Sequence, residues 1–197
     1  MLAALTGLGL SAAAGLNAYI PMLAVGLIAR HSELIALPAE FGWLTDGWVL
    51  AGLAVLLAAE VVLDKVPVVD SANDAVQTFV RPAAGGAVFA AADAAGKLDS
   101  SAFMRDHAWI GWGLGIVVAL IVHTAKASVR PVANAGTLGA GAPVLSTLED
   151  AASLVMSVLA ILVPVAGLIA VLLLGYAGLR LHRRRRRRRA ATRSAPT

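Results

Sequence analysis

The chain has 197 residues, of which 59% are hydrophobic and only 14% are charged, whereas soluble domains carry about a quarter charged residues. With a mean hydropathy of +0.80, this composition predicts an all-α integral membrane protein and leaves no room for a separate soluble domain. The chain has no cysteine, which excludes disulfides, thiolate metal sites and cysteine nucleophiles.

The charge is divided unevenly along the chain. Residues 180–197 hold nine of the sixteen Lys and Arg, so residues 1–179 carry seven basic against twelve acidic side chains. We therefore predict a polytopic membrane domain over 1–179 and a disordered, cytoplasmic, arginine-rich tail over 180–197. Arginines that directly follow a membrane helix attract anionic lipid headgroups, and we expect that contact rather than nucleic acid.

Four segments are predicted as long transmembrane helices: 2–29, 47–63, 108–124 and 151–179. Residues 1–29 and 151–179 contain no charged side chain, and each run exceeds the roughly 20 residues that a crossing helix needs. A signal peptide would open with basic residues, but none precedes Arg30. Tryptophans that suit interfacial anchoring flank the second and third segments, namely Trp43, Trp48, Trp109 and Trp112.

Two shorter uncharged stretches, 82–92 and 131–148, are rich in Gly and Ala. They are predicted as re-entrant or half-helix segments, which occur at membrane depth where backbone faces protein or a wet cavity. The alternative is a flexible linker outside the membrane. Both stretches follow the same entry, as Val80-Arg81-Pro82 and Val129-Arg130-Pro131, which suggests an internal duplication of the kind that builds many transporters.

The basic residues predict the topology. With four crossings or with six, thirteen Lys and Arg lie on one side and three on the other, and the positive-inside rule places both termini in the cytoplasm. The Ala-, Gly- and Arg-rich usage suits a high-GC bacterium, so we expect a multi-pass protein of the bacterial plasma membrane.

Carboxylates cluster after the second predicted helix. Glu60 and Asp64 lie four residues apart, as do Asp70 and Asp74, so each pair shares one face of a helix. Their oxygens suit a hard cation such as Mg²⁺, Ca²⁺ or Na⁺, although an interfacial loop with an amphipathic turn is the simpler explanation of Asp70 and Asp74. Glu60 within an apolar helix costs about 2.5–3.5 kcal/mol on insertion scales, so it should face a cavity or a partner. The alternative is that Glu60, about one turn from the helix end, reaches the interface or pairs with Lys65.

Other polar side chains in apolar surroundings are candidates for an ion path. His123 can exchange a proton near neutral pH, and Lys126 follows it one turn later; the simpler interpretation places both at the headgroups. The remaining candidates are Asn17, Asn134, Arg81 and Arg130. Pro21 and Pro164 should kink the first and fourth helices, and Gly111 with Gly115 forms a small-residue face for packing or oligomer contact.

Three stretches resemble the DUF4126 family of bacterial membrane proteins: SAAAGLNAYIPMLAVGLIAR, VLDKVPVVDSANDAVQTFVRPAAGG and HTAKASVRPVANAGTLGAGAPVLSTLEDAASL. They span most of residues 10–160. The resemblance implies a small multi-helix membrane domain and no particular activity, so no residue takes a role from it.

The leading functional prediction is a channel or transporter for a small solute, most simply a cation, with the Gly-rich segments lining the path. A chain this small should enclose a pore only as a homo-oligomer. If Arg81 and Arg130 faced the cavity, an anion would be the better ligand. The alternative is a non-transporting scaffold that binds lipid or a partner. A lipid-modifying enzyme that uses Asp70, Asp74 and His123 is disfavoured, because no spacing brings them together, and no cofactor is expected.

Overall fold

The computed structural model describes residues 2–65, 67–95, 107–137 and 141–165, with five single positions between 169 and 180. Over these residues the elements are α1 (Leu2–Leu16), α2 (Tyr19–His31), the 3₁₀ helix η1 (Ala39–Thr45), α3 (Gly47–Leu63), α4 (Pro67–Ala95), α6 (Ala108–Thr137) and α7 (Ala142–Leu162). This part of the chain contains no strand, and the all-α prediction is confirmed for it.

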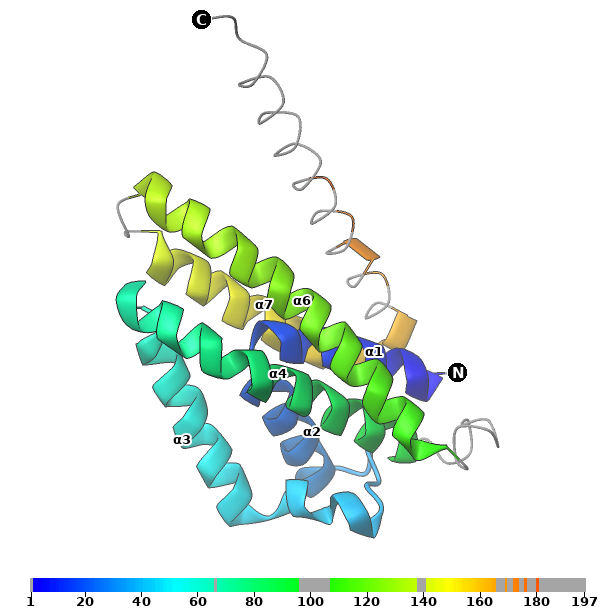
Figure 1. Ribbon diagram of the computed structural model, residues 1–197. Coiled ribbons are helices and arrows are strands. Elements are labelled where there is room, and N and C mark those ends of the chain that lie inside the picture. The colour runs from blue at the N-terminus through cyan, green and yellow to red at the C-terminus, as the bar shows by residue number, and fades with distance from the viewer. Residues whose placement is uncertain are drawn as a thin grey trace, which may run out of the picture.

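Helices α4, α6 and α7 run along the bundle, and α1 packs against all three (Figure 1). Helices α2 and α3 extend from the bundle and are joined through η1. The core is built largely of alanine and small aliphatic side chains of α1 and α4, including Leu10, Ala14, Val88 and Ala91. Small side chains allow the helix axes to approach closely.

The predicted first helix is broken after Leu16. The Asn17 side chain turns back and its Oδ1 accepts hydrogen bonds from the backbone N–H groups of Tyr19 (3.0 Å) and Ile20 (3.2 Å), which are among the N–H groups that a starting helix leaves without intrahelical partners. Pro21 then lies in the first turn of α2, where its missing N–H costs nothing. One uncharged run of sequence therefore forms two helices.

Glycines set the closest helix contacts. A Cβ at Gly85 of α4 would lie 2.8 Å from the Gly115 carbonyl oxygen of α6, and a Cβ at Gly15 would lie 2.6 Å from the Ala119 carbonyl oxygen. Gly111 faces Phe89 of α4. The small-residue face predicted on the third helix therefore packs within the chain.

The same packing corrects the interpretation of the two Gly/Ala-rich stretches. Residues 82–92 are not a separate re-entrant or half-helix segment, because α4 continues through Pro82 to Ala95. Residues 131–137 extend α6, and 142–148 open α7. In 82–92 the small residues Gly85 and Gly86 let α4 pack closely on α6 and do not interrupt the helix.

The prediction of four long transmembrane helices is not supported. Two described helices are long and apolar enough to cross a membrane, Ala108–Arg130 within α6 and Ala142–Leu162, and the pair η1 and α3, bent by 56°, would be a third. The fourth predicted helix begins earlier than expected and leaves helical geometry at Val163, since a residue before proline disfavours the α conformation. The predicted tail over 180–197 lies outside the described residues except for Arg180.

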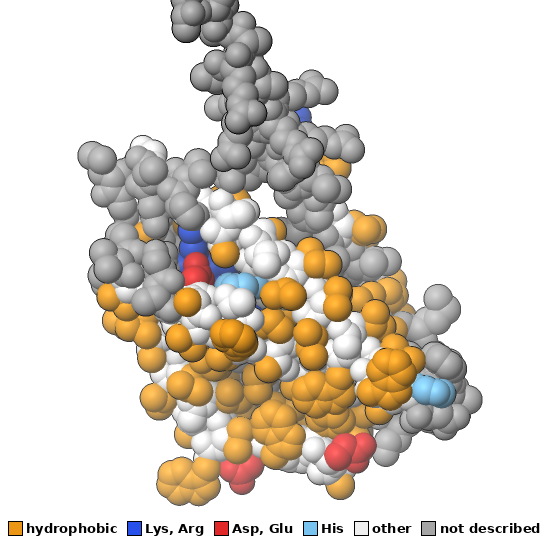
Figure 2. Space-filling view, viewed as in Figure 1, with side chains coloured by type: hydrophobic (Ala, Val, Ile, Leu, Met, Phe, Trp, Pro, Cys, Tyr) orange, Lys and Arg blue, Asp and Glu red, His pale blue; other side chains and the backbone are white. Residues whose placement is uncertain are grey.

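The bundle carries apolar side chains outward. Within the two candidate spans only 22% and 28% of the most apolar window is buried by protein, and Trp109, Val117, Ile121 and Leu154 are exposed. Figure 2 shows apolar side chains spread over much of the described surface in view. A surface this apolar is unusual for a soluble monomer and marks contact with membrane or protein.

Candidate functional site

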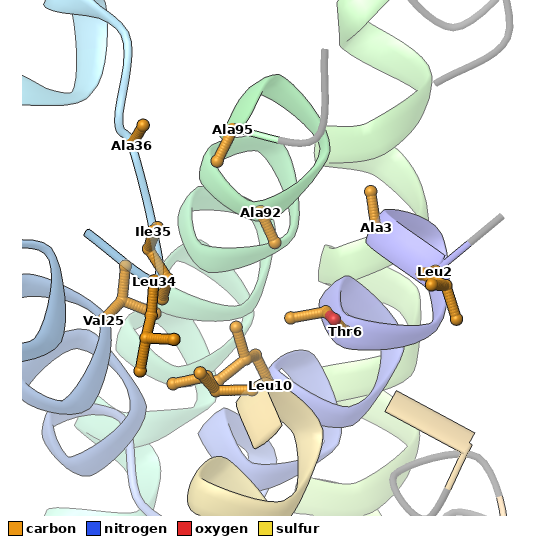
Figure 3. A pocket seen from close by; sticks show the side chains of 11 residues that line it. Leu2, Ala3, Thr6, Leu10, Val25, Leu34, Ile35, Ala36, Ala92 and Ala95 are labelled. Carbon is orange, nitrogen blue, oxygen red and sulfur yellow. The ribbon is translucent and has the colours of Figure 1, made fainter. Parts of the chain in front are cut away.

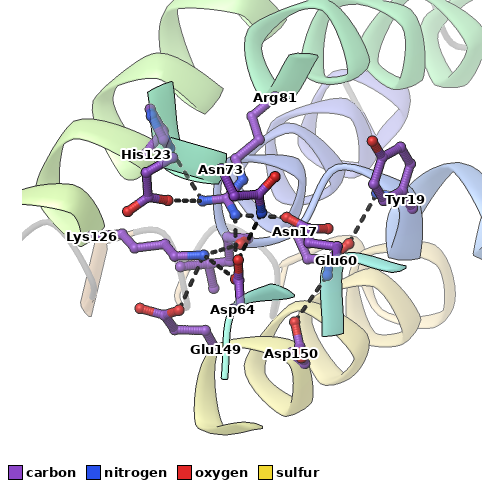
Figure 4. A network of polar contacts seen from close by, with 12 residues as sticks. Asn17, Tyr19, Glu60, Asp64, Asn73, Arg81, His123, Lys126, Glu149 and Asp150 are labelled. Atoms are coloured by element: carbon purple, nitrogen blue, oxygen red, sulfur yellow. Dashed lines mark hydrogen bonds and ion pairs between the residues drawn. The ribbon is translucent and has the colours of Figure 1, made fainter. Parts of the chain in front are cut away.

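Charged side chains gather inside the bundle, where α1 breaks, α3 ends, and the first parts of α4 and α7 meet the second half of α6 (Figure 4). We call this group the polar network. Its members are Asn17, Glu60, Asp64, Asn73, Asp74, Arg81, His123, Lys126, Arg130, Glu149 and Asp150.

Arg81 lies at the centre of the polar network and has no exposed surface. Its Nη2 donates to Glu60 Oε1 at 2.7 Å, and Asp64 and Asp74 lie at 3.9 and 3.8 Å. Arg81 lies in the middle of α4, directly before Pro82. The helix continues through both residues, although the sequence predicts the start of a re-entrant segment here. A guanidinium this deep is tolerated because carboxylates surround it.

His123 links Arg81 to the backbone of α4. Arg81 Nη1 lies 3.2 Å from His123 Nδ1, and Thr78 Oγ1 lies 3.0 Å from His123 Nε2. Because a guanidinium can only donate, Nδ1 accepts and the neutral ring donates from Nε2 to the Thr78 hydroxyl. That hydroxyl in turn donates to the Asp74 carbonyl oxygen at 2.9 Å. The arrangement specifies one tautomer of a neutral imidazole.

Arg130 and Lys126 come from α6 and share acceptors. Arg130 Nη2 donates to Asp64 Oδ2 at 2.9 Å and pairs with Glu149 Oε2. The Lys126 ammonium lies 3.0 Å from the same Glu149 oxygen and 3.7 Å from Asp64 Oδ2. Lys126 Nζ also donates to the Leu16 carbonyl oxygen at 2.9 Å. The last carbonyl of α1 is thereby part of the polar network.

The break in α1 is itself tied to α7. Asn17 Nδ2 donates to Asp150 Oδ1 at 2.9 Å, and the Ser153 hydroxyl donates to the Ala13 carbonyl oxygen at 2.9 Å. Asn17 therefore caps α2 through its oxygen and anchors α7 through its nitrogen. A break between helices is tolerated where neighbouring groups satisfy the freed backbone, as Lys126 does for the Leu16 carbonyl oxygen.

The two arginines of the repeated Val-Arg-Pro sequence have related surroundings. Both approach Asp64 and Asp74, and each has a glutamate of its own, Glu60 for Arg81 and Glu149 for Arg130. The two copies of the Val-Arg-Pro sequence thus place their arginines against the same two aspartates. That they arose by duplication stays a prediction.

The polar network carries more acid than base. Among the described side chains, five carboxylates, those of Glu60, Asp64, Asp74, Glu149 and Asp150, face three cationic side chains, those of Arg81, Lys126 and Arg130. With His123 neutral, full ionisation leaves an excess of negative charge. That excess attracts a cation or is neutralised by a proton.

Two aspartates outside the helices that could cross a membrane respond oppositely to their surroundings. Burial favours a higher pKa at Asp64, but Lys126 and Arg130 outweigh it and hold the pKa of Asp64 below its usual value. At Asp74 burial is the larger effect and raises the pKa despite Lys126 and Arg81. Asp64 is therefore a fixed charge, and Asp74 takes up a proton more readily.

Some buried oxygens have no hydrogen-bond partner among the described residues, including Glu60 Oε2, Gln77 Oε1 and Ser146 Oγ. Buried acceptors usually have a donor, a water or an ion. Within the described ranges, no group of three or more His, Asp or Glu side chains is arranged to hold a metal ion.

Eight of the ten residues predicted for the ion path belong to the polar network: Asn17, Glu60, Asp64, Asp74, Arg81, His123, Lys126 and Arg130. The side chains of the other two, Asp70 and Asn134, lie outside the described residues, although their backbones belong to α4 and α6. Glu60 faces a partner, Arg81, and the alternative pairing with Lys65 is not seen, because Lys65 donates to the Val61 carbonyl oxygen.

Glu149 and Asp150 were missed, along with Asn73. The two acids stand between uncharged runs of 18 and 29 residues, at 131–148 and 151–179, and that isolation was the available signal. It was interpreted as the boundary of a membrane helix. In the structure both acids lie within α7 and point at partners on α6 and at Asn17.

A cavity of about 280 Å³ lies apart from the polar network (Figure 3). It is lined by the first turns of α1, the end of α4 and the segment after α2, with Thr6 the one polar side chain in an otherwise aliphatic wall that includes Leu10, Val25 and Ile35. On α1 and α4 it occupies the ends opposite to the polar network. Its chemistry suits an alkyl chain and not an ion.

Comparison with known proteins places the chain in one family and gives no activity. No curated protein and no solved structure matches it. A family model described as a domain of unknown function (DUF4126) matches residues 4–184, which is most of the chain. The protein therefore belongs to the DUF4126 family, as its sequence motifs indicated.

Proposed function

We propose that this protein is a membrane channel or transporter for a small cation, and that the polar network is part of the path. The observation that carries the proposal is the inverted distribution of polarity: apolar side chains face outward on α6 and α7, while Arg81, Glu60 and Lys126 are at most 6% exposed. Ionisable residues within membrane helices are costly and normally mark ion or proton pathways.

The sign of the charge favours a cation. Arg81 and Arg130 are each engaged by carboxylates, so neither offers a free guanidinium to an anion. Among the described residues, the buried acceptors Glu60 Oε2 and Gln77 Oε1 have no hydrogen-bond partner, and neither does the donor Arg81 Nε. A small cation or a proton satisfies the two acceptors, and the excess of carboxylates favours a cation over an anion.

The proposed setting is the plasma membrane of a bacterium, crossed several times, with both termini in the cytoplasm. The number of crossings, four or six, is a prediction that cysteine labelling tests. The arginine-rich tail would contact anionic lipid, and a homo-oligomer would enclose the path.

The test is ion flux into liposomes that contain the purified protein, with a panel of monovalent and divalent cations, protons and phosphate. We expect flux selective for one cation class, reduced at least tenfold by Glu60→Gln. Glu40→Gln, at an exposed position of η1, is the matched control and should conduct as the wild type does. Folded protein that moves none of these ions, or flux insensitive to Glu60→Gln, would contradict the proposal.

The second candidate is a membrane scaffold that binds lipid or a protein partner. The specific observation in its favour is the aliphatic cavity lined by Leu10, Val25 and Ile35, which could hold an acyl chain. This function predicts that Glu60→Gln has no effect in cells, while removal of residues 181–197 abolishes function. The transport proposal predicts that Glu60→Gln impairs function more than removal of residues 181–197 does.

A further inference from the structure

The Lys126 ammonium occupies a position that resembles a cation site. Three oxygens surround it: the Leu16 carbonyl oxygen at 2.9 Å, Glu149 Oε2 at 3.0 Å and Asp64 Oδ2 at 3.7 Å. They come from three separate parts of the chain, and Lys126 is only 6% exposed. The ammonium has thus exchanged its water shell for protein oxygens.

The Leu16 carbonyl contributes a neutral oxygen ligand to this site. It belongs to the last residue of α1, where a helix leaves its carbonyls without intrahelical donors and carries partial negative charge. The break at Asn17 brings that end into the bundle interior and not to the surface. Carbonyl and carboxylate oxygens are the ligands that a hard metal cation takes, and an ammonium uses the same acceptors.

A second observation separates the site from a simple cluster of acids. Glu60 is 2% exposed, belongs to the same polar network, and its Oε2 has no hydrogen-bond partner among the described residues. The cations of the polar network, including the Arg81 that pairs with Glu60 Oε1, therefore leave a buried acceptor of the same network without a described partner.

We propose that the Leu16 carbonyl oxygen, Asp64 and Glu149 form a monovalent-cation site that the Lys126 ammonium fills, and that the cation moved by the protein competes with this ammonium. The first half concerns binding alone. The second half rests on the proposed transport function. It gives the substrate class as a monovalent cation that carboxylates and a helix-end carbonyl can hold.

The experiment measures thermal unfolding of the full-length protein in detergent, in NaCl, KCl, ammonium chloride or choline chloride at one ionic strength. For Lys126→Ala we expect at least one small cation to raise the Tm by about 2–4 °C over choline, saturably, once it exceeds its Kd several-fold. In the wild type the Lys126 ammonium competes with the added cation, so the same salt should raise the Tm by less than in Lys126→Ala.

Two controls isolate the site. Lys65→Ala removes an exposed lysine that also bonds a helix-end carbonyl, that of Val61 at 2.9 Å, and should respond as the wild type does. The double variant Lys126→Ala/Glu149→Gln removes one ligand with the ammonium and should lose the cation response. A Lys126→Ala protein whose Tm is the same in all four salts overturns the proposal.

If Lys126→Ala does not fold in choline chloride, recovery of folded protein in a small cation is the expected result. Lys126→Gln is the second variant that vacates the site, and failure of both variants in every salt also overturns the proposal. Flux measurements separate the two claims. A cation response without flux would keep the site and remove the transport function, and flux without a cation response would do the opposite.

Discussion

Asp64 contacts four side chains of the polar network: Arg81, Lys126, Arg130 and Asn73. Its Oδ2 faces Arg81, Lys126 and Arg130 at 3.9, 3.7 and 2.9 Å, and its Oδ1 accepts from Asn73 at 2.7 Å. It is 2% exposed. Removing this charge would leave three buried cations with less compensation, and the cost of an uncompensated buried charge exceeds the value of the pair itself.

Asp64→Asn should therefore lower the free energy of unfolding by about 3–5 kcal/mol, measured by denaturation in detergent. Asp46→Asn is the matched change, because Asp46 is an exposed cap of α3 whose Oδ1 accepts from Trp48 and Val49. Asparagine caps as well as aspartate, so this variant should stay within about 0.5 kcal/mol of wild type. Equal stability of the two variants would show that the polar network is not structural.

Most residues of the polar network could be identified from the sequence, but which of them pair with one another could not be predicted. Glu60 and Lys126 stand out because they are charged within or beside apolar runs. Their partners depend on which helices meet, and no local pattern contains that information. Glu60 had Lys65 five residues away and instead pairs with Arg81, 21 residues away.

At the scale of elements, the bounds predicted for the second helix match α3 and the predicted start of the third helix matches α6, whereas the break in the first run and the start of α7 were placed wrongly. The uncharged run over 1–29 hides the break at Asn17, since hydropathy does not register a capping side chain. The start of α7 was placed after Asp150 because charges usually end a membrane helix. Burial against Arg130 and Asn17 lets α7 begin at Ala142 instead.

The crossing of α4 and α6 can be tested with two glycines of one helix. A Cβ at Gly115 would lie 2.8 Å from the backbone carbonyl carbon of Gly85 and 2.8 Å from Phe89 Cβ, whereas a Cβ at Gly113 has open space. Gly115→Ala should force the helices apart and cost about 1–3 kcal/mol. Gly113→Ala should be neutral or more stable by up to about 1 kcal/mol, since alanine favours helix.

Thermal unfolding of the two variants in the same detergent measures this difference. Because both changes add one methyl group to α6, their contrast isolates the contact with α4 from helix propensity. A Gly115→Ala protein as stable as Gly113→Ala would mean that α4 and α6 do not cross at Gly85.

In the whole molecule, the charged side chains of the polar network lie inside and many apolar side chains lie outside. The composition predicts this arrangement only in part. The sequence predicted a membrane protein from its uncharged runs. It could not predict that α4, with Asp74 and Arg81 along its length, lies in the bundle beside α6. Ion pairs allow the charged helix α4 to lie inside the bundle, and hydropathy alone does not predict ion pairs.

Six crossings can be distinguished from four with single cysteines, since the chain has none of its own. Ser100→Cys lies between α4 and α6, and Gly136→Cys lies near the end of α6, where an added side chain meets open space. With six crossings and cytoplasmic termini, an impermeant thiol reagent added to intact cells should label position 100 and spare position 136. Labelling of position 136 alone would indicate the four-crossing arrangement.

The sharing of Asp64 and Asp74 between the two arginines has a consequence for how the family can diverge. Neither arginine can be lost alone, because each loss would leave carboxylates on α3, α4 and α7 without compensation. Substitutions at positions 60 and 81, and at 130 and 149, should therefore accumulate as matched exchanges across the family. Lineages that keep one member of a pair should keep the other.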